Sequence, residues 1–498
     1  MTFKTPILIL LFLSFFTSFA QKEVLSLTID DKTAMLPRTK KGFNFLNTTN
    51  GDLVIVMIDN KMGFANLFDK DFTEKSAVIF NPPKHENILG YKIIGNTYEI
   101  LFSNNSKKKF TIIRIDFDSK EVSEKDFKFD FEDEKYLETV HYNNQLFVFT
   151  GTKDNVFIIR ELGEGGFLTL KSFQIESRKQ DFLKLVGLKP FNPEREVNEN
   201  RKEKLLKREQ LFGSLKSNVT KIDNRVPNAI EQTAQNNKLY QNNKLVYLTI
   251  EDEDSLRTIF YKIDLESLDM EEAFYNYPKG RVGDFKKHNS YVLDNKLFQL
   301  GSSDNEMKIS VKSFSGEVLK EFYIERNQPI KFKNSPIIQD GKTFVPFVNR
   351  RELEETSQYL RKVSSGNIGL TGYKEGDLYY FTIGGFKESS SGGGGIMMGG
   401  GYGFTGSTAG GMPIVAYQEP TYHSYSSYTS TKSTFFNTHF DAAFNYVARE
   451  DSENIFDRIQ KFKKSIQYES AEDIFINDGK VYYSYYNLKE KTLRIIEM

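Results

Sequence analysis

Short apolar runs separated by turn dipeptides recur along most of the chain and define its organisation. One copy consists of Thr139–Tyr142, the pair Asn143-Asn144, and then Gln145–Phe149. Similar runs flank Asp294-Asn295 and Asp478-Gly479. Asn, Asp and Gly tolerate the positive φ angles that two-residue hairpin turns require. The pattern therefore predicts tight β-hairpins repeated through the chain.

The spacing of these turns predicts the fold class. Turn positions fall near residues 51, 96, 144, 243, 295, 341 and 479, and most consecutive ones lie 45 to 52 residues apart. A third and a fourth strand follow most hairpins, as in Phe110–Asp116 and Val318–Ile324. Four antiparallel strands per unit of this length are typical of a β-propeller blade. We predict an all-β protein, a β-propeller of seven or eight four-stranded blades.

The alternatives are a large β-sandwich and another all-β repeat such as a solenoid. Sandwich domains of roughly 100 residues need linkers between them, and no linker separates these repeats. Solenoid coils are shorter, about 20 to 30 residues each. Both alternatives fit the spacing less well than a propeller does.

The two ends of the chain carry complementary strand patterns. Ile474–Asn477, Val481–Tyr486 and Leu493–Glu497 supply three strands of a last blade, which then lacks its fourth. Val24–Ile29 alternates like a strand and has no hairpin partner nearby. Pairing the two ends would hide two sheet edges that otherwise invite aggregation. We predict that the N-terminal strand closes the ring.

Two insertions interrupt the repeat. Residues 176–236 are polar, and the charged stretch 194–209 predicts a helix behind Asn192-Pro193. Residues 386–433 are rich in Gly, Ser and Tyr and are expected to be mobile. A further helix is predicted over 453–466, behind Ser452, from apolar residues at helical spacing. The strand order places both insertions on one face of the propeller, together with Arg350 and Arg351.

The N-terminus has the pattern of a secretory signal peptide. Lys4 precedes an apolar run over Pro6–Phe19, and Ser18 and Ala20 stand at −3 and −1 before Gln21. The run is shorter than the roughly 20 residues that span a bilayer, which argues against the alternative of an uncleaved anchor. We predict a signal peptide over 1–20 and one exported propeller domain over 21–498. Its location would be periplasmic, cell-surface or extracellular, with no transmembrane segment in the mature chain.

Composition excludes several classes of chemistry. The chain has no cysteine, so disulfides, thiolate metal sites, iron–sulfur clusters and a cysteine nucleophile are ruled out. Its 67 basic and 67 acidic residues cancel. The chain therefore has no net positive charge that would attract nucleic acid. The 39% of hydrophobic residues, including 44 phenylalanines, suffice for a large core without disulfides.

Local motifs predict no catalytic, cofactor-binding or metal-binding residue. Gly401–Gly406 matches G-x-G-x-x-G, but no helix follows, as a dinucleotide site requires. The five histidines are scattered without metal-ligand spacing, and the acidic run Glu251–Asp254 lacks the alternating ligands of a calcium loop. G-x-S-x-G and the P-loop motif are absent.

These observations favour an exported, non-catalytic binding or scaffolding protein of the bacterial cell envelope, with a protein or glycan partner and no nucleic acid. One alternative is a hydrolase or lyase that acts on glycans or peptides through carboxylates at the propeller mouth. Another is an adhesive or matrix component that acts through the glycine-rich segment, because aromatic side chains in flexible segments often serve recognition. The predicted binding residues are Arg350, Arg351, Tyr402, Phe404, Tyr417, Tyr422, Tyr425 and Tyr428.

Overall fold

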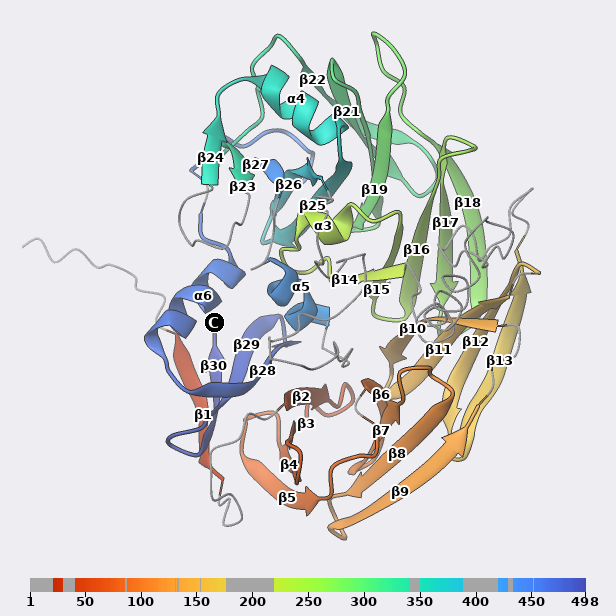
Figure 1. Ribbon diagram of the computed structural model, residues 1–498, viewed down its shortest axis with the longest axis vertical. Coiled ribbons are helices and arrows are strands. Elements are labelled where there is room, and N and C mark those ends of the chain that lie inside the picture. The colour runs from red at the N-terminus through yellow and green to blue at the C-terminus, as the bar shows by residue number, and fades with distance from the viewer. Residues whose placement is uncertain are drawn as a thin grey trace, which may run out of the picture.

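The computed structural model describes residues 21–29, 41–85, 87–129, 131, 134–152, 154–175, 219–340, 350–387, 420–428, 433–450 and 452–498. Within them the strands form seven sheets around a central axis, as Figure 1 shows. Five sheets have four strands, and two have a fifth. The predicted β-propeller is therefore confirmed, with seven blades. The predicted signal peptide and the predicted helix over 194–209 lie outside the described residues.

Each blade is an antiparallel sheet whose strands are named A to D from the axis outward. Blade 1 contains β2 (Lys41–Leu46), β3 (Leu53–Ile58), β4 (Gly63–Phe68) and β5 (Glu74–Phe80). Blade 2 contains β6 (Asn87–Ile94), β7 (Thr97–Ser103), β8 (Lys109–Asp116) and β9 (Glu121–Lys128). Blade 3 contains β10 (Glu134–Tyr142), β11 (Gln145–Thr152), β12 (Val156–Gly163) and β13 (Gly166–Gln174).

The remaining blades follow the same plan with two additions. Blade 4 contains β15 (Asn237–Asn242), β16 (Leu245–Asp252), β17 (Arg257–Asp264) and β18 (Asp269–Asn276), and β14 (Val219–Ile222) lies parallel to β15. Blade 5 contains β19 (Lys287–Leu293), β20 (Lys296–Ser302), β21 (Glu306–Ser313) and β22 (Val318–Glu325). Blade 6 contains β25 (Asn367–Glu375), β26 (Leu378–Phe386), β27 (Thr434–Phe440), β23 (Ile337–Asp340) and β24 (Arg350–Leu353). Blade 7 contains β28 (Glu469–Asn477), β29 (Lys480–Asn487), β30 (Thr492–Glu497) and β1 (Lys22–Thr28).

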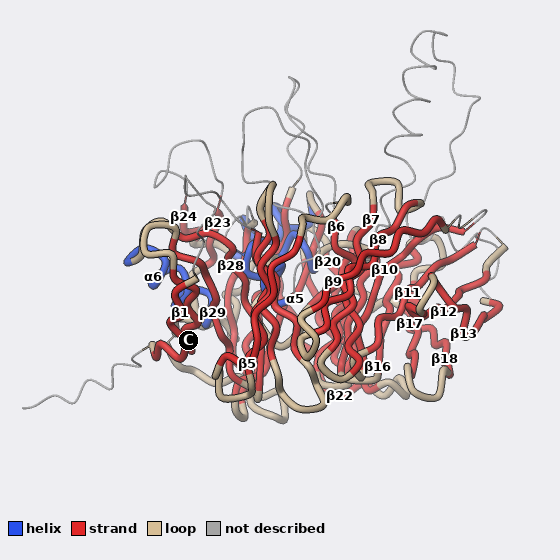
Figure 2. Tube along the Cα trace, turned by 90° about the horizontal axis from the view of Figure 1, so that it is seen from below, coloured by secondary structure: helices blue, strands red, loops and turns tan. Residues whose placement is uncertain are grey.

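The turn dipeptides adopt the backbone geometry that the sequence predicted. Asn143 and Asn144 have φ of 48° and 60°, and Asp294 and Asn295 have φ of 47° and 55°. Two successive positive φ angles give the turn whose twist matches that of the flanking strands. These turns join strand A to strand B of their blades. Strands run between the two faces of the disc, as Figure 2 shows, so the A–B turns share one face, here called the turn face.

The opposite face carries the B–C and D–A connections and is here called the insertion face. Strand β13 is a D strand that ends at Gln174, and β26 is a B strand that ends at Phe386. Alternating strand direction brings both ends to the insertion face, so the strand ends that flank the two predicted insertions share one face, as predicted.

Ring closure also follows the prediction. Strand β1 pairs antiparallel with β30, from Lys22 opposite Glu497 to Thr28 opposite Thr492. The N-terminal strand is thus the D strand of the blade whose other three strands end the chain. Val24, Leu25 and Leu27 pack on the cluster that joins blades 7 and 1.

Blade 6 differs from the predicted strand order. The turn at Asp340-Gly341 was expected to join strands A and B of a blade, with Arg350 and Arg351 in a B–C loop. Instead β23 is the D strand of blade 6, although it precedes that blade's other strands in sequence, and β24 pairs outside it. The A–B turn of blade 6 is at Gly376, whose φ is 61°. Arg350 and Arg351 therefore begin an edge strand at the outer rim, and their assignment to a B–C loop was wrong. Arg350 lies opposite Asp340, at the end of β23 on the insertion face, so the predicted face for these arginines is correct.

The described residues contain four helices: α3 (Ile230–Thr233), α4 (Thr356–Ser364), α5 (Pro420–Tyr428) and α6 (Ile455–Ser465). Helix α6 matches the helix predicted over 453–466, but its cap is not Ser452. The Asn454 side chain accepts from the backbone N–H groups of Phe456 and Asp457, and Asp457 accepts from Asn454 in return. This reciprocal capping box fixes where the helix begins.

The core lies between the blades and contains many aromatic side chains. Tyr240 of blade 4 meets Tyr291 of blade 5 edge to face, with ring centroids 5.5 Å apart and both side chains fully buried. Phe110, Phe127 and Phe167 form a similar cluster between blades 2 and 3. Edge-to-face pairs add about 0.5–1.5 kcal/mol to the free energy gained by burying each ring.

In the part of the chain that the structure describes, no helix has the length and apolar character to cross a membrane.

Candidate ligand site in the central channel

The centre of the ring is occupied by elements that come from the two insertions. Strand β14, the turn after it and α3 precede blade 4, and α5 precedes β27. Figure 1 shows β14, α3 and α5 together in the middle of the ring. We call these elements the central plug. No sequence pattern indicates that parts of two insertions about 200 residues apart meet here.

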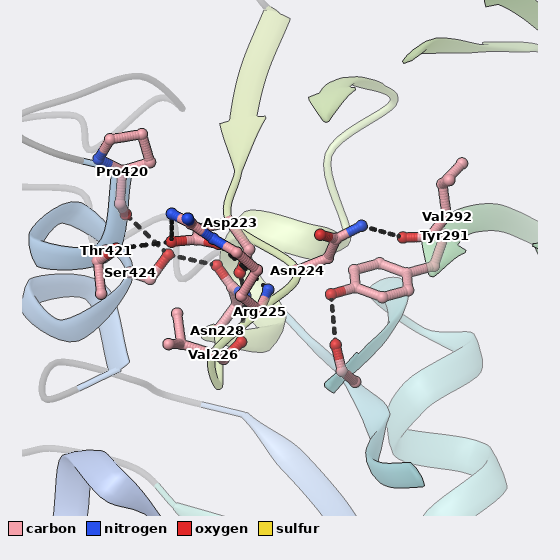
Figure 3. Close-up of polar contacts among 11 residues, drawn as sticks. Asp223, Asn224, Arg225, Val226, Asn228, Tyr291, Val292, Pro420, Thr421 and Ser424 are labelled. Carbon is pink, nitrogen blue, oxygen red and sulfur yellow. Dashed lines mark hydrogen bonds and ion pairs between the residues drawn. The ribbon is translucent and has the colours of Figure 1, made fainter. Parts of the chain in front are cut away.

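A buried polar network holds the two parts of the plug together, as Figure 3 shows. Thr421 of α5 donates to Asp223 Oδ2 at 2.7 Å, and Ser424 donates to Asn228 Oδ1 at 2.6 Å. Asn228 in turn donates to the backbone carbonyls of Asp223 and Val226. All four side chains in these contacts are at most 5% exposed. Helix α5 is therefore fixed to the turn after β14 by fully desolvated hydrogen bonds.

Asp223 also forms a bidentate ion pair with Arg225. Arg225 Nε lies 2.8 Å from Asp223 Oδ1, and Nη2 lies 2.9 Å from Oδ2. Burial alone would raise the pKa of Asp223, but the Arg225 guanidinium and the hydrogen bonds from Arg225 and Thr421 hold it below its usual value. Asp223 is thus ionised at neutral pH and orients the arginine.

The tyrosines of α5 are packed rather than presented to solvent. Tyr425 is 5% exposed, and its ring lies 5.4 Å from Phe456 of α6. Tyr428 packs 5.6 Å from the same ring and accepts a hydrogen bond from Asn454. Tyr422 packs on the same cluster. The expected mobility of 386–433 is therefore wrong for 420–428, because these aromatic side chains bury themselves on α6.

A cavity of about 430 Å³ lies beside the plug. Its wall comes from the inner strands of blades 1, 2, 3, 4 and 7, from their A–B turns, and from the plug. The lining residues are Asn44, Leu46, Thr48, Leu53, Tyr91, His141, Tyr142, Asn143, Lys221, Ile222, Asp223, Arg225, Gln241, Asn243, Pro420, Phe475 and Ile476. Most of the strand residues among them lie within the last three residues of an A strand, so the cavity lies in the half of the channel nearest the turn face.

The cavity is connected to solvent and is of ligand size. Arg225, in its wall, has a side chain that is 55% exposed, and Asn143 and Asn243 at the turns are also exposed. Small-molecule sites commonly measure about 300–1,000 Å³ and combine apolar walls with a few placed polar groups. Here the wall combines aromatic rings with side-chain amides.

The electrostatics of the wall favour a fixed positive charge. Lys221 and Arg225 contribute two cations, and Asp223 is the one carboxylate among the described lining residues. His141 stacks on Tyr91 with centroids 4.0 Å apart. Burial, and then the nearby Lys221, lower the pKa of His141 to about 3. At neutral pH the imidazole is uncharged, so the described lining residues carry one net positive charge.

None of the predicted binding residues is among the described lining residues of the cavity. Tyr402, Phe404 and Tyr417 lie outside the described residues. Arg351 is exposed on the edge strand β24, and Tyr422, Tyr425 and Tyr428 belong to the plug. The lining residues were not predicted from the sequence. The turns at Asn143 and Asn243 were recognised, but nothing in the sequence showed which turns surround a cavity.

Comparisons with known proteins add no family. No protein-family model matches the chain, and no curated protein matches its sequence. Solved structures that resemble it include the N-terminal domain of Nup159 (10% identity, 96% of this chain and 94% of that one, TM-score 0.32). A member of the DUF4221 family from Bacteroides vulgatus covers 96% of this chain and 98% of its own at 8% identity and TM-score 0.31. The WD40 domain of SCAP from fission yeast covers 93% and 88% at 7% identity and TM-score 0.28. Similarities this low carry no functional inference, and the propeller assignment rests on the strand pairing.

Proposed function

We propose that this protein is an exported, non-catalytic binding protein of the bacterial cell envelope that holds a small polar ligand, free or as part of a larger partner, in the central cavity. The observation that supports binding is the cavity itself. It is solvent-connected, is backed by a plug held by buried hydrogen bonds, and is lined by amides and aromatic rings. Export is supported by the signal-peptide pattern of residues 1–20.

The charges in the wall favour binding over hydrolysis. Retaining and inverting glycosidases use a pair of carboxylates, one of them a general acid with a raised pKa. Asp223 is the single carboxylate of the described wall, and its pKa is lowered by Arg225 and Thr421 against the effect of burial. The pKa of His141 is too low for a general base near pH 7. Neither group is suited to acid–base catalysis at neutral pH.

The test compares ligand binding by purified residues 21–498 with binding by a variant in which a larger side chain fills part of the cavity. Thermal unfolding is measured with a panel of monosaccharides, sugar acids, amino acids and dipeptides, and any compound that raises Tm is titrated by calorimetry. Leu46→Trp places a large ring in the wall and should weaken binding at least tenfold. Ile94→Trp is the matched control, because Ile94 ends the inner strand of the next blade but is not a lining residue.

The outcomes separate the alternatives. A bound ligand recovered unchanged after prolonged incubation supports a binding protein, whereas a cleaved product supports the hydrolase alternative. Binding that persists in Leu46→Trp would exclude the central cavity as the site.

A further inference from the structure

The charged side chains of the cavity wall already have partners within the chain. Arg225 forms the bidentate ion pair with Asp223, whose side chain is 2% exposed. Lys221 donates to the backbone carbonyl of Thr139 at 3.2 Å, and both cations have further interactions of their own. A ligand carboxylate would have to compete with these partners, and a ligand ammonium would meet two cations in the same wall. The wall is therefore suited to a ligand without charge.

An oriented acceptor in the wall belongs to Gln241 of β15. Its Nε2 donates to the carbonyl oxygen of His141 in blade 3 at 2.6 Å and to that of Asn243 at 3.0 Å. Carbonyl oxygens only accept, so the amide nitrogen must face both of them. Gln241 Oε1 has no hydrogen-bond partner among the described residues. Because Gln241 lines the cavity, a ligand that donates a hydrogen bond can satisfy this oxygen.

A second unpaired acceptor belongs to Asn44 of β2. Its backbone N–H donates to Asp473 Oδ2, and its Nδ2 donates to Ser484 Oγ, both at 2.9 Å. The Ser484 hydroxyl gives its own hydrogen to the carbonyl of Asp473, so it must accept from the nitrogen of Asn44. Asn44 is 2% exposed and lines the cavity, yet its Oδ1 has no partner in the described part of the chain. Buried polar atoms without a partner are rare in native proteins, and a bound ligand would account for this one.

Other lining groups both donate and accept. Burial, and then the nearby Lys221, lower the pKa of His141 to about 3, so its imidazole is neutral at pH 7 and carries one donor and one acceptor. Its Nε2 has no hydrogen-bond partner among the described residues. Asn143 and Asn243, on exposed turns, add side-chain amides with a donor and an acceptor end. The wall thus combines unpaired acceptors with neutral groups that bond in either sense.

Hydrogen bonds between blades fix the rim of the cavity on the turn face. Asn144, in the A–B turn of blade 3, accepts at Oδ1 from the backbone N–H and the hydroxyl of Thr48 in the A–B turn of blade 1, at 3.1 and 3.2 Å. Its Nδ2 donates to Asn47 Oδ1 at 2.8 Å and to Thr49 Oγ1 at 3.0 Å, and its carbonyl accepts from Ile93 of blade 2. Thr48 itself lines the cavity. A rim held in this way loses little conformational freedom when a ligand binds.

We propose that the cavity binds a neutral sugar, whose hydroxyl groups donate to the unpaired acceptors of the wall and first of all to Gln241 Oε1. A hydroxyl group donates and accepts, so it also matches the turn amides and the imidazole. Amino acids and sugar acids carry charges that the wall does not match, because its own ions are paired within the chain. This inference rests on the proposed function, since it names the ligand class of the same cavity.

The experiment measures sugar binding by purified residues 21–498 with calorimetry. The neutral probes are the methyl glycosides of glucose, galactose, mannose and N-acetylglucosamine and the disaccharides maltose and lactose. The charged counterparts are the methyl glycosides of glucuronic acid, galacturonic acid and glucosamine. At least one neutral sugar should bind about ten times more tightly than any charged counterpart, and added salt should change its affinity less than about twofold, because no ion pair forms. This comparison uses the wild-type protein, so it does not depend on the folding of a variant.

A variant of Gln241 tests the site itself. Gln241→Met keeps the length of the side chain but removes the oriented acceptor, and it should weaken binding of that sugar about tenfold. Gln174→Met is the matched control. Gln174 also donates its amide to two backbone carbonyls, those of Asp154 and Asn155, but it is not a lining residue. Its loss should leave the affinity unchanged.

The remaining outcomes separate this inference from the proposed function. A charged counterpart that binds as tightly as the best neutral sugar, or an affinity that falls steeply with salt, would overturn the inference. An unchanged affinity in a folded Gln241→Met would overturn it too, because the sugar would then lie elsewhere. If amino acids or dipeptides of the wider panel bind and no sugar does, the sugar assignment is wrong and the proposed function stands. If no compound binds at all, the proposed function fails as well.

Discussion

At the scale of single residues, the centre of the molecule depends on ionisable groups held in one protonation state. Asp223 is kept charged by Arg225, and His141 is kept neutral by burial and by Lys221. Elsewhere Lys238 and Glu251 are buried together between blades 4 and 5. The pairings of His141 with Lys221 and of Lys238 with Glu251 do not follow from the sequence, because the partners lie on different strands. Asp223 and Arg225 are only two residues apart, but the burial of Asp223 depends on tertiary packing.

The neutral state of His141 makes stability depend on pH. Its pKa is about 3 in the folded protein and about 6.5 when the chain unfolds, so the unfolded state binds more protons between these values. The stabilisation is fully present above pH 6.5 and is lost as pH falls toward 3. Urea unfolding at pH 7 and pH 5 should show that the wild type loses about 1–2 kcal/mol more than His141→Gln.

The control for this comparison is His85→Gln. Burial lowers the pKa of His85 too, but the carboxylate of Asp126 opposes that shift. The effect of His85→Gln on acid stability should therefore be smaller. An identical pH dependence for wild type and His141→Gln would contradict the assignment of a neutral, desolvated imidazole.

The buried pair of Lys238 and Glu251 gives a second test at this scale. Lys238 Nζ lies 3.7 Å from Glu251 Oε1, and the two side chains are 0% and 1% exposed. Burial lowers the pKa of Lys238 to about 8, although Glu251 opposes the shift. Lys238→Met would leave the carboxylate buried without its cation, which costs about 3–5 kcal/mol. Denaturant unfolding should show this loss, and the double variant Lys238→Met, Glu251→Gln should recover part of it.

A matched change at the surface should have little effect. Lys262 and Glu271 form an ion pair whose side chains are 33% and 72% exposed. Lys262→Met should cost less than about 1 kcal/mol. Equal losses for Lys238→Met and Lys262→Met would mean that the buried pair contributes no more than a surface pair.

At the scale of elements, local chemistry predicted the strands and hairpins but not every connection between them. Asn143-Asn144 and Asp294-Asn295 fold as predicted because a two-residue turn depends on its own backbone. Strand β23 was assigned to the wrong position because its partner, β27, lies about 100 residues further along the chain. Helix α5 was missed because its low-complexity sequence has little amphipathic pattern, and its position is set by contacts with Asp223 and Phe456.

The start of α6 tests one such local detail. The sequence favoured Ser452 as the residue behind which the helix begins, whereas Asn454 makes the capping hydrogen bonds. Asn454→Ala should therefore destabilise the protein by about 1 kcal/mol, within the range of 0.5–2 kcal/mol for lost N-caps. Ser452→Ala should change the free energy of unfolding by less than about 0.5 kcal/mol. The reverse ranking in chemical denaturation would show that the helix begins earlier than the structure places it.

At the scale of the whole molecule, the propeller is a ring in which each blade packs on its neighbours, so its closure matters to all of them. The inner strands of blades 7 and 1 approach closely: a Cβ added at Gly42 of β2 would lie 2.1 Å from the carbonyl oxygen of Ala471 in β28. The period of the turns was enough to predict the ring and the joining of its ends. It was not enough to predict the central plug, because the plug belongs to the segments that break the period.

Closure predicts an unusually large effect for a terminal truncation. Removing residues 21–29 takes away β1, exposes the edge of β30, and removes the buried Ile29 and the partly buried Val24, Leu25 and Leu27 from the cluster between blades 7 and 1. These four apolar side chains and the strand ladder contribute roughly 5 kcal/mol, which corresponds to a fall in Tm of roughly 10 °C. Glu23→Ala is the control, because it removes only the exposed ion pair with Arg494 and should cost less than about 1 kcal/mol. A synthetic peptide of residues 21–29 should bind the truncated protein and restore most of the lost Tm. An unchanged Tm after truncation would refute closure by β1, and a failure of the peptide to bind would show that the edge of β30 is not a vacant strand position.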